Sequence, residues 1–413
     1  MKSEVIFNAG NVLADCSGSA ICTSRLDVTV VMPCLNEART LGGCIREATQ
    51  AMNDAGIVGE IVVADNGSTD GSQVIASGLG ARVVTVASRG YGSALRGGIQ
   101  ASRGEFVIMG DCDGSYDFNH IPRILSKLRE GNDLVLGNRF LGGVQKDAMP
   151  WLHRYLGNPV LTAIGRILFR CPVADFHCGL RGLKRSSFDR MQLRTTGMEF
   201  ASEMVVKTRL AGMRMAEVPT VLRPDGRDRP PHLRSWRDGW RHLRFMLLLS
   251  PRWLFVWPGC LLAVVGSTMV LLVAAVGGEL VPGIHLSVNT SLAFALLTMF
   301  GSQLVMTGVF ARVAATRLGI LPGSDLLRRL SRRFSLESGV VVGMALMVLG
   351  VSGFAAAAML WGKAGFGDLD SRWSVQVVIP AVLFVNLGMQ LLFGSFLLAL
   401  LGMASNVSKD GCS

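Results

Sequence analysis

The chain has 413 residues, of which 50% are hydrophobic and only 17% are charged, and its formal net charge is +11. Soluble proteins average about 25% charged residues, so this composition excludes a disordered chain and a small disulfide-stapled domain. The charge is also unevenly distributed, because only nine of the 41 Lys and Arg residues and six of the 30 Asp and Glu residues lie after residue 252. The sequence therefore divides into a charged first part and an apolar second part.

From Asp27 onward, short apolar runs alternate with amphipathic stretches, whereas residues 1–26 read as a tail. The runs predict buried strands and the stretches predict connecting helices. Alternation at this spacing predicts an α/β fold with a mostly parallel, doubly wound central sheet. The expected strands are Val28–Met32, Glu60–Ala64, Arg82–Ala87 and Glu105–Gly110, and the expected helices are Thr40–Met52 and Tyr91–Ser102.

Acidic residues follow three of the predicted strands, at Pro33–Glu37, Asp65–Gly71 and Asp111–Asp117. Ligands of such sheets bind beyond the carboxyl ends of the strands. The pair Asp111 and Asp113 offers oxygen ligands that suit a divalent cation such as Mg²⁺ or Mn²⁺. Such a cation would neutralise charge developing on a nucleoside diphosphate leaving group. We therefore expect a nucleotide-binding, metal-assisted site at this edge.

A glycine-containing loop, Arg89–Leu95, also follows a strand and opens a helix. Leu95 stands where a dinucleotide-binding fingerprint has its third glycine, so this pattern does not predict a dinucleotide site. Close approach of the loop backbone to a nucleotide phosphate or sugar remains open.

Residues 223–252 form a basic and aromatic segment just before the apolar part. Seven Arg and two Trp between residues 223 and 244 predict an amphipathic helix that lies in the membrane interface. Trp151–Arg170 shows a similar pattern. The basic segment adjoins the bilayer and so does not indicate nucleic-acid binding, and its cations are expected to meet anionic headgroups.

Four uncharged runs in residues 253–413 are each long enough to cross a bilayer in a helix. Arginines concentrate between the second and third runs, at 312, 317, 328, 329, 332 and 333. The positive-inside rule places that loop in the cytosol, and an even number of spans places both termini and the first part of the chain there too. The expected spans are about 253–276, 288–310, 339–360 and 375–404.

Four motifs appear in order: Pro33-x-x-Asn36-Glu37, Asp65–Gly71, Arg89-Gly90-x-Gly92 and Asp111-x-Asp113-Gly114. Together they resemble a family 2 glycosyltransferase with the GT-A fold, most of all the dolichol-phosphate mannose/glucose synthase-like polyprenyl-phosphate glycosyltransferases. The resemblance implies a GT-A catalytic domain at 27–222, an interfacial segment at 223–252 and a four-helix transmembrane domain at 253–413. Asn66 and Ser115 depart from the usual pattern, in which Asp and Gln are found.

The resemblance also implies roles for individual residues. Asp111 and Asp113 would bind the metal, and Arg139 and Arg154 would contact phosphate groups, Arg154 that of the lipid. Asp175, in Asp175-x-x-x-Gly179-x-Arg181, would belong to the acceptor side, although a helix cap or a partner of Arg181 is an equal alternative. The expected catalytic residues are Asp113, Arg139, Arg154 and Asp175, and the expected nucleotide-sugar ligands are Pro33, Leu35, Glu37, Asp65, Asp111, Cys112, Arg227, Arg229 and His232.

We therefore expect a membrane-bound inverting hexosyltransferase. Its donor would be a UDP- or GDP-hexose and its acceptor a polyprenyl phosphate, dolichyl or undecaprenyl; homo-oligomerisation is left open. One alternative is transfer to another membrane lipid, whose neutral hydroxyl would need a general base. Another is a non-catalytic scaffold or lipid translocator with a degenerate nucleotide domain. The intact Asp-x-Asp pair and the charge-free spans argue against the latter.

Overall fold

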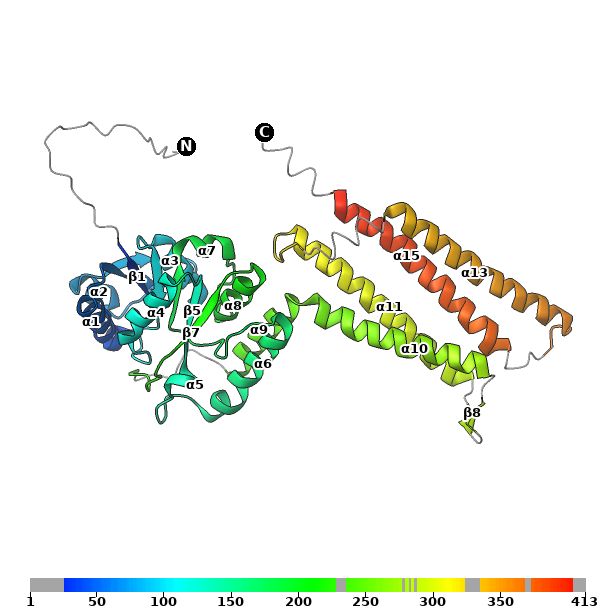
Figure 1. Cartoon of the computed structure of the whole chain (residues 1–413), viewed down its shortest axis with the longest axis horizontal. Helices are drawn as coiled ribbons and strands as arrows, with labels where there is room; N and C mark the ends of the chain where they lie inside the picture. Colours follow the sequence, from blue (N-terminus) through cyan, green and yellow to red (C-terminus); the bar gives the residue numbers. More distant parts are fainter. Residues whose placement is uncertain are drawn as a thin grey trace, which may run out of the picture.

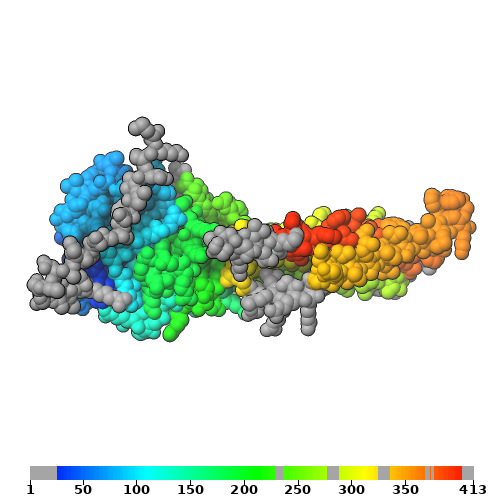
Figure 2. Space-filling model, turned by 90° about the horizontal axis from the view of Figure 1, so that it is seen from above, coloured from blue at the N-terminus to red at the C-terminus, as the bar shows by residue number. Residues whose placement is uncertain are grey.

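The computed structural model describes residues 26–227, 235–276, 279–281, 284–285, 288–323, 335–367 and 373–403. Figure 1 shows a sheet with helices around it at one end and a bundle of long helices at the other. The second view, in Figure 2, shows the same elongated arrangement. The tail up to residue 25, Arg229, His232 and the loop arginines 328, 329, 332 and 333 lie outside the described residues.

Seven strands of the described chain form one mixed sheet in the order β3-β2-β1-β4-β6-β5-β7. β6 runs antiparallel to its neighbours β4 and β5, whereas the other pairings are parallel. The predicted α/β fold with a mostly parallel sheet is therefore confirmed. The strands are β1 (Val28–Cys34), β2 (Gly59–Asp65), β3 (Arg82–Thr85), β4 (Phe106–Met109), β5 (Leu134–Asn138), β6 (Arg181–Lys184) and β7 (Met215–Pro219).

Helices cover both faces of the sheet because alternate side chains of each strand point to opposite sides. Val30 of β1 packs in one apolar cluster with Ile45 and Leu128, and Val31 packs in the other with Leu95 and Met204. The helices are α1 (Ala38–Asp54), α2 (Ser72–Gly78), α3 (Tyr91–Ala101), α4 (Ile121–Arg129) after the turn η1 (Phe118–His120), α5 (Arg139–Gly142), the π-helical η2 (His153–Gly157), α6 (Asn158–Phe169), α7 (Arg185–Met191) and α8 (Phe200–Leu210).

Four helices in the described part of the chain are long and apolar enough to cross a membrane. They agree with the four predicted spans, although the second and third are longer than predicted. The first two are joined by the short antiparallel strands β8 (Glu279–Val281) and β9 (Ile284–His285). The helices are η3 with α10 (Arg252–Val276), α11 (Val288–Arg317), α13 (Leu336–Lys363) and α15 (Ile379–Met403), which follows η4 (Ser374–Val378).

Glycines let these helices approach closely in consecutive pairs. A Cβ atom on Gly301 of α11 would lie 2.6 Å from the carbonyl oxygen of Gly259 in α10, and one on Gly388 of α15 would lie 2.6 Å from that of Gly343 in α13. Small residues at helix contacts are typical of membrane bundles, in which lipid supplies no hydrophobic force between helices.

Two amphipathic helices lie between the sheet and the bundle, α6 and α9 (Ser235–Leu248), and they pack against each other (Figure 1). Leu321, just after α11, is buried in the apolar cluster that also holds Phe169 and Met246 of these helices. The predicted helix over 223–244 is wrong at its start, because the described residues 223–227 are not helical and α9 begins at Ser235.

Candidate active site

The carboxyl ends of β1, β2, β4 and β5 lie at one edge of the sheet. The register shows this directly: Cys34 is paired with Asp65, and both Met109 and Leu136 are paired with Arg181. The acidic loops that follow these strands are therefore gathered at one edge, as the sequence predicted. We call this region the acidic edge.

Arg227 neutralises two carboxylates of the acidic edge. Its Nε lies 2.9 Å from Oε1 of Glu37, and its Nη1 lies 3.0 Å from Oδ2 of Asp113. The other oxygen of Asp113 accepts hydrogen bonds from the backbone and hydroxyl of Ser115. Arg227 is thus placed beside the cation and diphosphate position that the sequence predicted.

Asp111 lies beside Asp113 and is enclosed by aromatic and glycine residues. Burial raises its pKa to about 6, to which the charge of Asp113 also contributes, while a hydrogen bond with Tyr91 opposes the rise. A Cβ atom on Gly179 would lie 2.7 Å from Oδ2 of Asp111, and the Gly179 amide donates to the hydroxyl of Tyr116. The glycine of the Asp175-x-x-x-Gly179-x-Arg181 motif therefore makes room for Asp111.

The donor set fits a hard divalent cation. No group of three or more His, Cys, Asp or Glu side chains in the described residues could hold a metal ion on its own. Asp111 and Asp113 nevertheless offer carboxylate oxygens, and Mg²⁺ is usually held by one or two carboxylates together with water and substrate phosphates. The raised pKa of Asp111 reflects burial and like-charge repulsion, both of which a cation would offset.

Arg139 and Asp175 form a buried, two-bond ion pair at the end of β5. The Nε and Nη2 atoms of Arg139 lie 2.7 and 2.8 Å from the two oxygens of Asp175. Burial alone would raise the pKa of Asp175, but the Arg139 guanidinium holds it below its usual range. Glu217 of β7 accepts from the Asp175 amide at 2.9 Å, which fixes the acid from a second side.

Arg181 is not the partner of Asp175, so that alternative is corrected. Its guanidinium is fully buried and donates to the backbone carbonyls of Phe176, Cys178 and Ala201. Three carbonyl dipoles solvate the charge in place of a carboxylate. The pairing follows from the chain path, because the end of β5 brings Arg139 next to Asp175 while β6 directs Arg181 into the core.

The remaining predicted nucleotide ligands lie at the ends of β1, β2 and β4 with different exposure. Leu35 is exposed and Pro33 half-buried, so both are open to a base. Asp65 is fully buried and accepts from the amides of Gly67 and Ser68, which shapes the loop. Cys112 is also buried, and its thiol donates to the Pro33 carbonyl while its own carbonyl accepts from the Thr40 hydroxyl.

Asn66, which departs from the family pattern, organises the neighbouring loop. Its amide nitrogen donates to the carbonyls of Val86 and Ser88, and its oxygen accepts from the Gly90 amide at 2.7 Å. An aspartate has no N–H groups for the first two bonds. The asparagine therefore suits this loop, where the sequence showed only a missing charge.

Gly90 and Gly92 are needed for contact with another loop of the protein. A Cβ atom on Gly90 would lie 2.3 Å from the carbonyl oxygen of Thr196, and Gly90 has a φ of +127°. A Cβ atom on Gly92 would lie 2.8 Å from the Thr195 carbonyl oxygen. The close approach that the sequence left open to a nucleotide is made here by the backbone of residues 195–197.

The segment 222–227 runs alongside the acidic loop after β4. Leu222 forms an isolated antiparallel β-bridge with Tyr116. The backbone amides of Arg223 and Gly226 donate to the backbone carbonyls of Ser115 and Asp113, respectively. The Arg223 side chain pairs with Glu47 and Asp117 at 2.9 and 2.7 Å. Arg223 and Arg227, predicted as part of the interfacial segment, therefore belong to the catalytic domain.

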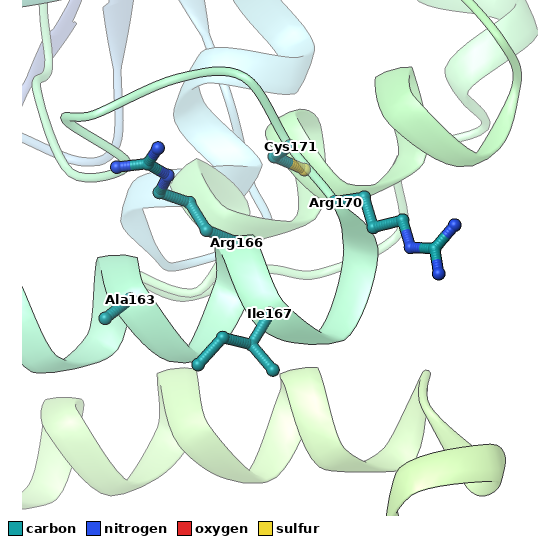
Figure 3. Close-up of a pocket in the computed structure, with 5 residues that line it drawn as sticks. All are labelled: Ala163, Arg166, Ile167, Arg170 and Cys171. Carbon is teal, nitrogen blue, oxygen red and sulfur yellow. The ribbon is translucent and has the colours of Figure 1, made fainter.

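The segment that precedes α6 is aromatic and basic. Arg154 lies 5.5 Å from the ring of Tyr155, whose side chain is exposed, as is that of Trp151. A pocket of about 480 Å³ lies at the C-terminal end of α6. Figure 3 shows Arg166 and Arg170 on either side of Cys171. None of the residues that line this pocket is a predicted site residue.

Sequence reasoning missed the tyrosines of the site. The chain contains only three Tyr, and two of them, Tyr91 and Tyr116, lie beside Asp111. Their scarcity and their positions within the two predicted site loops were the available signal. It also missed His177, which occupies an unspecified position of the Asp175-x-x-x-Gly179-x-Arg181 motif, and His242, which belongs to none of the motifs.

This fold and site define a glycosyltransferase that is built onto a membrane domain. Residues 29–192 match the model of glycosyl transferase family 2, and residues 309–402 match that of the glycosyltransferase family 2 C-terminal transmembrane region. The chain is 37% identical to the low-salt glycan biosynthesis hexosyltransferase Agl6 of Haloferax volcanii over 91% of this chain and 89% of that protein. The chain therefore belongs to glycosyltransferase family 2 and is an integral membrane protein with the GT-A fold.

Two further relatives are more distant. A dolichyl-phosphate hexose transferase of Haloferax volcanii is 29% identical over 48% of this chain and 83% of that protein. The crystal structure of glucosyl-3-phosphoglycerate synthase from Mycobacterium tuberculosis, in complex with Mn²⁺, UDP and phosphoglyceric acid, covers 54% of this chain and 76% of that chain. It aligns with a TM-score of 0.41 at 23% identity, a likeness too low to bear on the function of this chain.

Proposed function

We propose that the protein transfers a hexose from UDP- or GDP-hexose to a polyprenyl phosphate, with inversion at the sugar carbon. The observation that carries this proposal is helix α9, which packs on the catalytic domain that holds the acidic edge, exposes Trp236 and Trp240, and leads into the first membrane span. The relative named as a dolichyl-phosphate hexose transferase supports the acceptor class. The catalytic domain and both termini would lie in the cytosol, as the Arg-rich loop indicates.

The acidic edge would bind the nucleotide sugar. Asp111 and Asp113 would hold Mg²⁺ or Mn²⁺, which when bound neutralises the charge of the diphosphate leaving group. Pro33 and Leu35 are placed to contact the base, and Arg227 to contact the diphosphate. Arg229 and His232 would assist on the same side. Glu37 and Asp113 hold Arg227 in this position before the donor arrives.

The acceptor needs to be positioned more than deprotonated, because a phosphate oxygen is already anionic at neutral pH. Arg139 and Arg154 would align it through the fork geometry of the guanidinium group. Asp175 would hold Arg139 in place. Its pKa is depressed by Arg139, which makes it a weak base for a neutral hydroxyl acceptor. This supports the phosphate acceptor over a diacylglycerol or ceramide.

A transfer assay tests this proposal. The full chain in lipid nanodiscs, with Mg²⁺ or Mn²⁺ and labelled UDP- or GDP-hexoses, is expected to glycosylate polyprenyl phosphate but not diacylglycerol or ceramide. Asp113→Asn should lower the rate by about 10²–10³-fold, since it removes a carboxylate that would hold the cation which stabilises the leaving group. Asp54→Asn, an exposed position at the end of α1, is the matched control. NMR of the anomeric carbon tests inversion.

Transfer only to a neutral lipid would overturn the proposal that the acceptor is a polyprenyl phosphate. Unchanged nucleotide binding in Asp113→Asn, with no transfer from any donor by the wild type, would favour the scaffold alternative.

A further inference from the structure

We propose that Ser202 and His242 are positioning residues that connect the interfacial helix α9 to Arg139 through a continuous hydrogen-bonded path. This inference rests on the proposed function, in which Arg139 aligns the acceptor phosphate. Neither residue belongs to a motif of the sequence or contacts the acidic edge.

Helix α9 has two faces of different chemistry. Trp236 and Trp240 are 82% and 58% exposed and face away from the catalytic domain. The opposite face, at a spacing of four residues, carries Asp238, His242 and Met246, which are buried to 2%, 6% and 0% exposure. An apolar face would suffice to pack a helix, so the buried histidine calls for a separate explanation.

The path begins at His242. Its Nδ1 lies 2.8 Å from the Ser202 hydroxyl of α8, and that hydroxyl lies 3.5 Å from Nε2 of His177, at the outer limit of a hydrogen bond. The His177 amide donates to Oδ1 of Asp175 at 3.2 Å. Asp175 in turn holds the Arg139 guanidinium by two bonds.

Both histidine rings on this path are neutral, and the unpaired nitrogen of His177 indicates which way the hydrogen bonds run. Burial lowers the pKa of His242 to about 4 and that of His177 well below its usual range, so both are neutral near pH 7. Because a buried N–H without a partner is rarer than an unpaired acceptor, we assign the His177 proton to Nε2, which donates to the Ser202 hydroxyl, and the Ser202 proton to the bond with Nδ1 of His242. His177 Nδ1 is then a lone pair, and it has no hydrogen-bond partner among the described residues. The rings also meet edge to face at 4.7 Å.

The path matters because it holds Asp175 from a third direction, beside the bonds from Arg139 and the contact with Glu217. Glu217 of the sheet holds the backbone of residues 174 and 175, whereas residue 177 is held by its contacts with α8 and α9. Seating α9 in the bilayer would therefore set the position of residues 175–177, and with it the direction of the Arg139 guanidinium. Small displacements of a positioning group lower rates steeply.

Three variants test this inference in nanodiscs that contain polyprenyl phosphate. Ser202→Ala removes the bridge, and His242→Phe keeps a ring but removes the acceptor nitrogen. We expect each to lower kcat/KM for the lipid acceptor about tenfold and to leave KM for the nucleotide sugar within twofold. His242→Asn should restore most of the activity, because its side-chain oxygen can accept from Ser202.

Ser187→Ala is the matched control, since Ser187 is equally buried and its hydroxyl donates to Asp133 away from this path. It is expected to behave as wild type toward both substrates. If Ser202→Ala acts through Arg139, it should have little further effect in an Arg139→Lys background.

The outcomes separate this inference from the proposed function. If the wild type does not glycosylate polyprenyl phosphate, both are overturned. If it does, and the Ser202 and His242 variants match the wild type or change both substrates equally, only the positioning role is overturned. Equal activity of His242→Asn and His242→Phe would also overturn it.

Discussion

The catalytic domain and the membrane bundle are held together by different means. The catalytic domain buries charged and polar groups in defined pairs, such as Arg139 with Asp175 and Lys207 with Glu203. In the bundle, contacts between helices rest on glycine and backbone, as between Gly343 and Gly388. One chain therefore uses directional bonds where it binds a charged substrate and close backbone packing where it meets lipid.

The difference shows what each solvent allows. In water, burial of apolar surface drives folding, so polar groups in the core are free to fix geometry at a site. In lipid this driving force is absent between helices, and small residues let dispersion forces and backbone contacts act instead. Damage in the two regions should consequently have different signatures, and four substitutions test this.

The largest effect is expected at the buried ion pair. Arg139→Ala would leave Asp175 charged and unpaired in the core, which costs about 3–5 kcal/mol. For a domain of this size the catalytic-domain Tm should fall by roughly 10 °C, measured by calorimetry or by intrinsic fluorescence. The control is Arg139→Met with Asp175→Leu, which should regain most of the stability without activity.

The same pair has a defined pH dependence. Since the folded-state pKa of Asp175 is depressed, its stabilisation is present above the unfolded value of about 3.9 and is lost as the pH falls below it. The double variant should lack this part of the acid-induced loss. If the free energy of unfolding of the wild type and of the double variant fell equally with decreasing pH, the role given to Asp175 would be contradicted.

A second effect is expected in the bundle. A valine at Gly343 would meet the Gly388 carbonyl at 2.8 Å and the Leu392 amide at 3.0 Å, so the α13–α15 pair must separate. Overpacking of this kind costs about 1–3 kcal/mol. Gly362→Val, on the same helix with only one atom at 3.8 Å, is the control.

Thermal unfolding in detergent measures the loss in Gly343→Val, and nucleotide binding should stay unchanged in both variants. A loss of nucleotide affinity in Gly343→Val would contradict the claim that packing defects in the bundle leave the catalytic domain unchanged.

A smaller effect is expected from Asn66→Asp. The two bonds from the side-chain amide to Val86 and Ser88 would be lost, and the new carboxylate would face their carbonyl oxygens. We expect a loss of about 1–2 kcal/mol in denaturant unfolding of the catalytic domain. Asn53→Asp, at an exposed position near the end of α1, should be neutral.

The smallest effect is expected at an exposed ion pair. Nζ of Lys127 lies 2.9 Å from Oε2 of Glu130, and the two side chains are 42% and 51% exposed. Lys127→Gln should change stability by less than about 0.5 kcal/mol, since solvent screens such pairs. Lys207→Gln, whose pair with Glu203 is buried, should lose more stability. Equal losses in the two variants would show that burial does not determine how much an ion pair contributes to stability.

The strands and the acidic edge could be predicted because they depend on local pattern. Apolar runs mark β1, β2 and β4, and the rule that ligands lie at strand ends places Asp65, Asp111 and Asp113 together. The four membrane helices follow from length and hydropathy alone.

Partners across the fold could not be predicted in the same way. Asp175 has Arg139 and Arg181 as candidate partners, and only the course of β5 and β6 decides between them. Residues 222–227 are not helical but contact the loop after β4, and no local pattern records these contacts. Gly90 is required by Thr196, more than 100 residues away.

The glycine contacts of the bundle have a consequence for its assembly. Each tight pair, α10 with α11 and α13 with α15, joins helices that follow one another among the described spans. Contacts close in sequence form fastest, and a chain is synthesised from its N-terminus. The first hairpin can therefore close before the second leaves the ribosome, and we expect the membrane domain to insert as two successive hairpins that dock afterwards.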